Sequence, residues 1–181
     1  MSEHWVDLDW SGMEVLSYDE CLALLADSPV GRVGFVDAGS PVILPVNFTL
    51  DGRSVVFRSG RGSKLSSAMM ERPVCLEADG WDAVEHTGWS VLAKGVAEHV
   101  VDESETERLG GLPVQPWSRP EVRQDWVRIR IDELSGRRIV REEMHAGNQR
   151  IGGDDDFVAA ARTEQAGLVE QAEAARAGER R

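Results

Sequence analysis

Three β-rich runs separated by hairpin signals constrain the fold of this chain most. The runs are GRVGFV (31–36), PVILPVNFTL (41–50) and SVVFRS (54–59), and they consist mainly of β-branched and aromatic residues. Asp37-Ala38-Gly39-Ser40 separates the first two runs, and Asp51-Gly52 separates the second from the third. Asp-Gly is the strongest of these signals, because a tight hairpin turn needs positive φ angles. The sequence therefore predicts a three-stranded meander.

Pro45 interrupts the second of these runs. Proline has no N–H to donate to a neighbouring strand, so within sheets it is confined to edge strands and bulges. We therefore expect this strand to lie at an edge, or to carry a bulge, at Pro45. A ligand could reach backbone atoms where strand pairing is interrupted.

Three further strands are predicted at 74–78, 88–101 and 125–131. Their boundaries are set by expected turns at Gly80-Trp81-Asp82 and Ser135-Gly136, and the long middle strand is expected to bend at Gly95. Short helices are predicted at 63–71 and 102–109. Six strands joined mainly by tight turns predict a mainly β fold with short helices, either a small β-barrel or an α+β barrel.

A helix is predicted just before the first strand. Ser17 and Glu20 have the spacing of a capping box, which places the helix start at Tyr18. The helix should run to about Ser28, with Leu22 and Leu25 on its inner face, because Pro29 cannot continue it.

The charges divide the chain into three parts. The net charge is -12, yet residues 1–20 hold six acids and no Lys or Arg, and residues 142–181 hold nine acids against five bases. We expect an acidic N-terminal extension at 1–15, one barrel domain at 16–141, and an Ala/Glu-rich tail at 142–181 that is mobile or marginally helical. The tail has too few large apolar residues to form a core of its own.

A glycine- and serine-rich turn follows the third strand, with the sequence RSGRGSKL at 58–65. Arg58, Arg61 and Lys64 bring positive charge, while Ser59 and Ser63 bring hydroxyl groups. Glycines let backbone N–H groups approach an anion closely, and a helix that begins at Ser63 would present its positive end. The spacing matches neither a Walker A loop nor a Rossmann fingerprint. The turn is therefore a candidate phosphate site, with an ordinary solvated turn as the alternative.

The charge, the apolar runs, the cysteines and the histidines limit the classes of partner and predict where the protein is located. The positive charge is local on an acidic protein, which suits a small anionic ligand and argues against nucleic acid. No run of about 18 apolar residues and no signal-peptide pattern occurs, so we expect no membrane partner and a cytoplasmic location. Cys21 and Cys75 are expected to be buried, reduced thiols. The four histidines show no metal-like spacing.

Taken in order, these motifs carry a family resemblance over about residues 16–139. GRVGFV, PVILPVNF, VVFRSGRGSKL, PVCLEAD, TGWSVLAKGVAEHV and WVRIRIDELSGRRI together resemble the flavin-binding split-barrel family related to pyridoxamine 5'-phosphate oxidase, in particular its short actinobacterial-type members. The resemblance implies a six-stranded antiparallel split barrel and a homodimer. It also implies FMN bound in clefts between the subunits, where it serves redox chemistry on a small-molecule substrate.

The resemblance assigns a cofactor-binding role to ten residues. Lys64 matches the family lysine at the cofactor phosphate, and its neighbours at the phosphate and ring edge are Arg58, Ser59 and Ser63. The strand whose backbone lies along the flavin ring corresponds to Pro45, Val46, Asn47 and Phe48. Trp89 and Ser90 match a segment that the other subunit can supply. Two alternatives stay open: Asn47 as an amide tied to backbone, and Trp89 as part of the dimer core.

Two departures from related proteins bear on the activity. Nitroimidazole-resistance relatives have histidine where this chain has Arg58, and the substrate-binding C-terminal segment of pyridoxamine-phosphate oxidases has no match in SGRRIVREEM. The resemblance thus implies a flavin-dependent oxidoreductase with no assigned catalytic side chain. The alternative is a non-catalytic protein that binds or stores FMN, a deazaflavin or haem.

Overall fold

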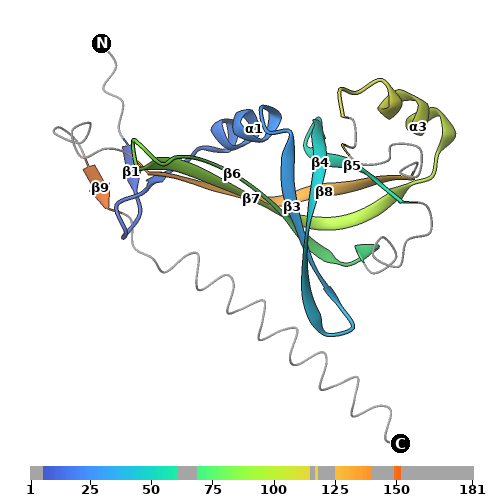
Figure 1. Cartoon of the computed structure of the whole chain (residues 1–181), viewed down its shortest axis with the longest axis horizontal. Coiled ribbons are helices and arrows are strands. Elements are labelled where there is room, and N and C mark those ends of the chain that lie inside the picture. Colours follow the sequence, from blue (N-terminus) through green and yellow to red (C-terminus); the bar gives the residue numbers. More distant parts are fainter. Residues whose placement is uncertain (1–5, 61–68, 115–116, 118–124, 140–148, 152–181) are drawn as a thin grey trace, which may run out of the picture.

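The computed structural model describes residues 6–60, 69–114, 117, 125–139 and 149–151 of the chain. Its six long strands are β3 (Val30–Asp37), β4 (Ser40–Asp51), β5 (Ser54–Ser59), β6 (Pro73–Asp82), β7 (Thr87–Val100) and β8 (Asp125–Ile139). They pair antiparallel in the order β5-β4-β3-β6-β7-β8, and β8 pairs back onto β5 to close a partial ring (Figure 1). The predicted six-stranded antiparallel barrel with short helices is confirmed.

Three short strands extend the sheet beyond β8. β2 (Glu14–Val15) pairs with β8, β1 (Val6–Leu8) pairs with β2, and β9 (Gln149–Ile151) pairs in parallel with β1. These strands belong to the segments assigned from the sequence to the acidic extension and the polar tail. Parts of both segments therefore join the sheet, which a division of the chain by charge does not detect.

Arginines of β8 hold the acidic N-terminal segment on the sheet. The Arg137 Nε donates to Asp9 Oδ2 at 2.6 Å, and the Arg138 Nη1 donates to Glu14 Oε2 at 3.0 Å. Asp9 is buried, which by itself would raise its pKa, but hydrogen bonds from Ser11, Met13 and Arg137 lower the pKa overall. The negative charge of this segment is thus matched to positive charge on the strand that it covers.

Helix α1 (Tyr18–Ala26) begins with the predicted capping box. The Ser17 N–H donates to Glu20 Oε2 at 2.9 Å, and the Glu20 N–H donates back to Ser17 Oγ at 3.4 Å. The helix ends two residues before the predicted Ser28. Its fully buried positions are Cys21 and Leu25 rather than the predicted pair of Leu22 and Leu25, because residues four apart share the face that meets the sheet.

The cysteines form no disulfide. Cys21 is buried on the inner face of α1, and burial raises the pKa of its thiol. Cys75 is only half-buried, and its Sγ lies 3.7 Å from the Gly34 carbonyl oxygen. The prediction of reduced thiols is therefore confirmed, whereas full burial holds for Cys21 alone.

Both predicted hairpin turns are present. Ala38 and Gly39 join β3 to β4 with positive φ angles of 48° and 83°. Gly52, with φ of 62°, is the first residue of the turn from β4 to β5. At Pro45, β4 pairs only with β3, through Arg32, since its described pairing with β5 begins at Phe48. The edge position expected for Pro45 is confirmed, without a bulge in the β3–β4 register.

Two sites predicted as turns lie inside strands instead. β6 continues through Gly80-Trp81-Asp82, and the turn follows at residues 83–86. The Asp82 Oδ1 there accepts hydrogen bonds from the N–H groups of Val84 and Glu85. β8 likewise continues through Ser135-Gly136 as far as Ile139. Both turn predictions were wrong.

Glycine is required at these two sites by packing. A Cβ at Gly80 would lie 2.6 Å from Trp89 Nε1, because the indole lies across the glycine on the neighbouring strand. A Cβ at Gly136 would lie 2.6 Å from Cys21 Sγ, where α1 packs on β8. A glycine that permits such close approach has the same local sequence signal as a glycine in a turn.

Gly95 marks an irregularity in β7, as predicted. The pairing of β7 with β8 shifts register between Lys94 and Gly95. A Cβ at Gly95 would collide with the Arg130 carbonyl oxygen. The absence of a side chain therefore lets the long strand bend around the barrel.

The barrel has two apolar clusters. The main cluster fills the interior beneath α1 and includes Val33, Phe57, Leu76 and Ile129. The second cluster lies on the outer face where α3 (Glu103–Gly110) packs, and it consists of Val56, Leu109, Val114 and Trp126. Figure 1 shows α1 and α3 over different parts of the sheet.

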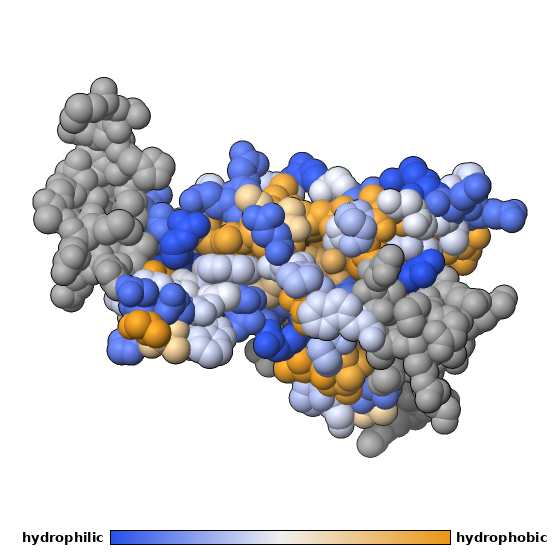
Figure 2. Space-filling model, turned by 45° about the horizontal axis from the view of Figure 1, so that its top comes forward, coloured by the Kyte–Doolittle hydropathy of each residue, from blue (hydrophilic) through white to orange (hydrophobic). Residues whose placement is uncertain are grey.

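Large apolar side chains also remain on the surface. Trp10, Trp81 and Trp117 are all exposed, and Figure 2 shows apolar surface interspersed with hydrophilic residues. Within the described part of the chain, no helix is long and apolar enough to cross a membrane.

Candidate functional site

Arg58 and Trp126 form the centre of the candidate site. They are direct cross-strand partners of β5 and β8, so their side chains project from the same face of the sheet. The Arg58 Cζ lies 4.9 Å from the centre of the Trp126 ring, which is a cation–π arrangement. The Arg58 Nε and the Trp126 Nε1 are both buried, and neither has a hydrogen-bond partner among the described residues. Two donors are therefore unsatisfied side by side.

A second arginine on the same face is fully neutralised. The Arg128 Nη2 donates to Glu105 Oε1 at 2.6 Å and to Asp51 Oδ2 at 3.1 Å. These carboxylates, Glu105 first, raise the pKa of Arg128. Among the described residues no carboxylate pairs with Arg58. In the described part of this face, Arg58 is thus an arginine whose charge is not neutralised by a carboxylate.

Asn47 lies beside this pair but serves the backbone. Continuing the β4–β5 register by one residue beyond Phe48–Phe57 places Asn47 opposite Arg58. The Asn47 Nδ2 donates to the Pro29 carbonyl oxygen at 3.1 Å, and its Oδ1 accepts from the Trp117 N–H at 2.9 Å. The amide therefore ties β4 to the start of β3 and to the segment before β8, which is the structural alternative considered for it.

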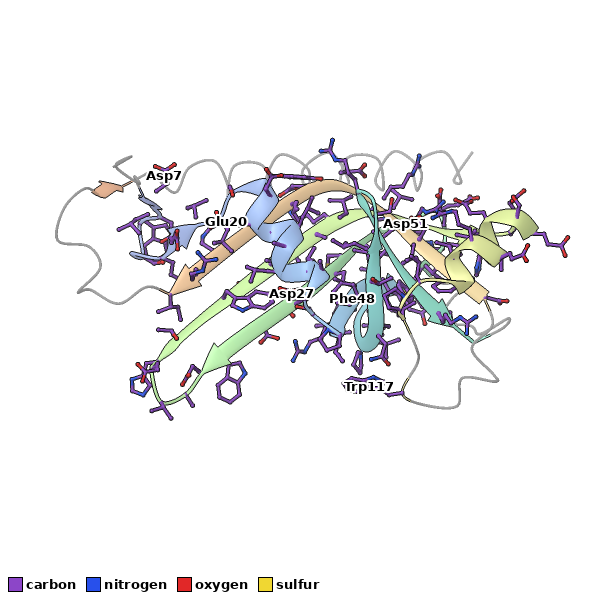
Figure 3. The ribbon with its side chains drawn as sticks, turned by 90° about the horizontal axis from the view of Figure 1, so that it is seen from above. Asp7, Glu20, Asp27, Phe48, Asp51 and Trp117 are labelled. Carbon is purple, nitrogen blue, oxygen red and sulfur yellow. The ribbon has the colours of Figure 1, made fainter. Side chains whose placement is uncertain are left out.

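The hydrogen bond from its N–H to Asn47 also places Trp117 beside the candidate site. Its side chain is exposed although its backbone is held by Asn47, and Figure 3 shows Trp117 beside the strand that carries Phe48. An exposed indole is thus anchored next to the candidate site. No local sequence pattern indicates a role for Trp117.

Three of the predicted residues face the barrel interior. Val46 and Phe48 are buried in the main cluster, and Ser59 is also buried, because alternate residues of a strand project to opposite faces. Pro45 is exposed on the outer face. The side chains of Val46, Phe48 and Ser59 therefore do not join Arg58, although their backbone lies in the strands that carry the site.

Trp89 and Ser90 lie at the other end of the sheet. The Arg58–Trp126 row meets β7 at Val100, and Trp89 is eleven positions earlier in that strand. At about 3.3 Å per residue, this is roughly 36 Å along β7. Trp89 packs against Gly80 and the main core, and Ser90 is exposed. One chain does not bring these two residues to Arg58.

Ser63 and Lys64, the remaining predicted residues, lie outside the described residues. They follow Ser59 and Gly60 directly in the sequence, so their assignment to a phosphate remains a prediction. The described residues hold no cluster of three or more His, Cys, Asp or Glu arranged to bind a metal ion.

Trp126 is the site residue that sequence reasoning missed. The alternation in DWVRIRI predicted a strand, but nothing local indicated which residue of another strand each position would face. A register prediction for β5 and β8 would have found the pair, because an Arg and a Trp placed opposite each other in a sheet interact favourably.

Comparison with known proteins identifies the family. The family model described as pyridoxamine 5'-phosphate oxidase matches residues 17–138, which is more than half of the chain. The chain belongs to this family. The matched region contains α1, the six long strands except for the last residue of β8, and both residues of the Arg58–Trp126 pair.

Relatives and solved structures agree with this assignment. The uncharacterized protein Rv0080 of Mycobacterium tuberculosis is 36% identical over 133 residues, covering 70% of this chain and 86% of that protein. The structure of the FAD binding protein from Mycobacterium smegmatis is similar with a TM-score of 0.61 and 34% identity, covering 70% of this chain and 98% of that chain. A conserved protein of unknown function from Corynebacterium diphtheriae has a TM-score of 0.61 and 32% identity, covering 71% and 98% respectively.

The pyridoxamine 5'-phosphate oxidase family implies a flavin cofactor. A flavin nucleotide presents phosphate, which is an acceptor of hydrogen bonds and an anion. Arg58 has a positive charge with no carboxylate partner among the described residues, and its buried Nε has no acceptor. The residues present therefore fit a phosphate-bearing cofactor on this face.

Proposed function

We propose that this protein binds FMN and uses it for redox conversion of a small organic substrate. The observation that carries the proposal is Arg58, a cation without a carboxylate partner on the described face of a chain of this family. The similar FAD binding protein from Mycobacterium smegmatis supports a flavin as the ligand. The flavin, when bound, would supply hydride or electron transfer.

The chain's own residues would bind and orient the cofactor. Arg58 would contact the phosphate by charge-assisted hydrogen bonds, together with Lys64 and Ser63 from the segment that follows β5. Among the described residues, the pairing of β4 with β5 begins only at Phe48, which would let the flavin ring lie along the strand at Pro45. Asn47 would hold the strand in place through its bonds to Pro29 and Trp117.

A homodimer completes this proposal. Trp89 and Ser90 lie at the opposite end of β7 from the Arg58–Trp126 row, so both groups could contact one flavin only if two copies of the chain supplied them. Exposed Trp10 and Trp81 offer apolar surface for such an interface. The cofactor would then lie in a cleft between the subunits.

Spectroscopy and titration test the proposal. The purified protein should bind FMN more tightly than riboflavin, which has the ring but lacks the phosphate, and FAD should be titrated in parallel. Reduced nicotinamide with an electron acceptor should then give turnover. Binding of flavin without turnover with any acceptor would favour the non-catalytic carrier. A single violet band or a Soret band would identify a deazaflavin or haem instead, and failure to bind any of them would overturn the proposal.

A further inference from the structure

The Trp126 ring restricts how Arg58 can be oriented. The guanidinium carbon lies 4.9 Å from the ring centre, within the range in which the ring quadrupole attracts a cation. A planar guanidinium stacks on an indole face, whereas a flexible ammonium group has no plane to stack. Because the two residues are direct partners across β5 and β8, the sheet register keeps them opposite each other.

Trp126 is itself held in place. Its side chain is 2% exposed and packs with Val56 of β5, with Leu109 of α3 and with Val114, which follows that helix. Two ion pairs fasten α3 to the same face: Arg108 to Asp51, and Glu105 to Arg128. The ring is therefore a rigid support, with its position set by the helix above it.

The arrangement is poorly explained by folding stability alone. Arg128, two residues along β8 from Trp126, has three carboxylate partners: Asp51, Glu98 and Glu105. Among the described residues, Arg58 has only the Trp126 ring as a partner, and its buried Nε has no acceptor. Buried donors without acceptors are costly and rare in native proteins. Such exceptions are expected where a side chain is kept ready for a ligand.

We propose that Trp126 is a positioning residue, which holds the guanidinium of Arg58 in the orientation that receives the anionic phosphate of the bound cofactor. This inference rests on the proposed flavin function and extends it to a residue that need not touch the cofactor. It places α3 in the binding site indirectly, since the helix packs on Trp126 and Trp126 contacts Arg58.

Variants of Trp126 test the proposal, because they should change the affinity for FMN but not the affinity for riboflavin. Trp126→Leu removes the aromatic face and should weaken FMN binding about 2- to 30-fold, the equivalent of one cation–π contact. Riboflavin binding should change less than 2-fold, because riboflavin has no phosphate for Arg58 to receive. Trp126→Phe keeps an aromatic face and should rescue most of the FMN affinity. Val36→Ala, which alters an exposed apolar residue of β3 outside the proposed site and interface, is the control and should change neither affinity.

A cofactor-free measurement gives an independent readout. In ¹⁵N NMR spectra of the flavin-free protein, the Arg58 Nε–H signal should be shifted by the indole ring current, and this shift should disappear in Trp126→Leu. Addition of FMN should move the signal in the wild-type protein, whereas addition of riboflavin should not. An Arg58 signal at the position typical of a solvated arginine in the wild-type protein would overturn the proposal.

The outcomes separate this inference from the proposed function. Equal losses of FMN and riboflavin affinity in Trp126→Leu would mean that Trp126 supports only the fold, and unchanged FMN affinity would also overturn its role. If Trp126→Leu does not fold, Arg58→Lys decides: it keeps the charge but loses the planar stack, and unchanged FMN affinity would contradict the proposal. If the wild-type protein binds no flavin, the proposed function itself fails.

Discussion

Asp51 at the end of β4 and Arg108 of α3 form an ion pair with two hydrogen bonds. The Arg108 Nη1 donates to Asp51 Oδ1 at 2.9 Å, and its Nη2 donates to Asp51 Oδ2 at 2.7 Å. Arg128 of β8 adds a third bond to the same carboxylate. This carboxylate therefore links a hairpin, a helix and a strand around the cluster that holds Trp126.

Asp51→Asn should destabilise the protein by about 1 kcal/mol at neutral pH, a value reduced because Arg108 is half-exposed. The hydrogen bond from Arg108 is the largest cause that lowers the pKa of Asp51 below its ordinary 3.8. The stability that the ionised Asp51 contributes to the folded state is therefore complete above pH 3.8. This stability is lost as the pH falls through the lower pKa of Asp51 in the folded protein. Urea unfolding at pH 7 and at decreasing pH values below 3.8 should show the wild-type advantage shrinking. Asp132→Asn, at an exposed carboxylate of β8, is the control and should have little effect at either pH.

Gly95→Ala should destabilise the barrel by more than about 2 kcal/mol, because the added Cβ meets the Arg130 carbonyl oxygen at the bulge of β7. Gly110→Ala, at the end of α3, has open space around the new methyl group and should be neutral or slightly stabilising. Thermal unfolding of the two variants checks the prediction. Equal melting temperatures would show that β7 accommodates a side chain at the bend.

Ser17→Ala should cost about 1 kcal/mol, because it removes the hydroxyl that accepts from the Glu20 N–H and donates to Glu20 Oε2. Ser17→Asp keeps an acceptor at the cap and should recover most of that stability. Denaturant unfolding measures both variants. A loss in Ser17→Asp as large as that in Ser17→Ala would mean that the cap contributes little.

Arg58→Ala and Lys64→Ala should each weaken FMN binding about 10- to 150-fold, through the loss of charge-assisted hydrogen bonds worth about 1.5–3 kcal/mol. Riboflavin should respond little to either change. Arg72→Ala, an exposed arginine after the candidate segment, is the control and should do far less. Flavin fluorescence titration gives all of these affinities. Equal FMN affinity for the wild type and the Arg58, Lys64 double variant would place the phosphate elsewhere.

Light scattering of the purified protein with FMN should give the mass of a dimer at micromolar concentration. The reason is the separation of Trp89 from the Arg58–Trp126 row within one chain. If the protein is a dimer in which the partner subunit supplies Trp89, a Trp89→Ala variant should bind flavin more weakly. In a monomer the same variant should bind flavin as the wild type does. A monomer that retains its flavin would contradict the two-copy site.

Several features could be predicted because they depend on neighbouring residues. The turns at Gly39 and Gly52, the capping box of Ser17 with Glu20, and the bend at Gly95 each follow from the backbone freedom of glycine or from a local hydrogen bond. The strands followed from alternation over a few residues. Arg58 is a candidate from the same kind of local pattern, as a cation at the end of a β-rich run, and its contact with an anion remains a prediction.

The sequence by itself determined which segments become the six long strands, where the first hairpins turn and where the first helix begins. Only the tertiary structure decided that Gly80 and Gly136 lie inside strands under Trp89 and Cys21, and that Trp126 stands opposite Arg58. The physical reason is that these relationships join residues far apart in the chain. They are fixed by strand register and by packing across the barrel, whereas local propensity is the same whether a glycine makes a turn or admits a neighbouring side chain.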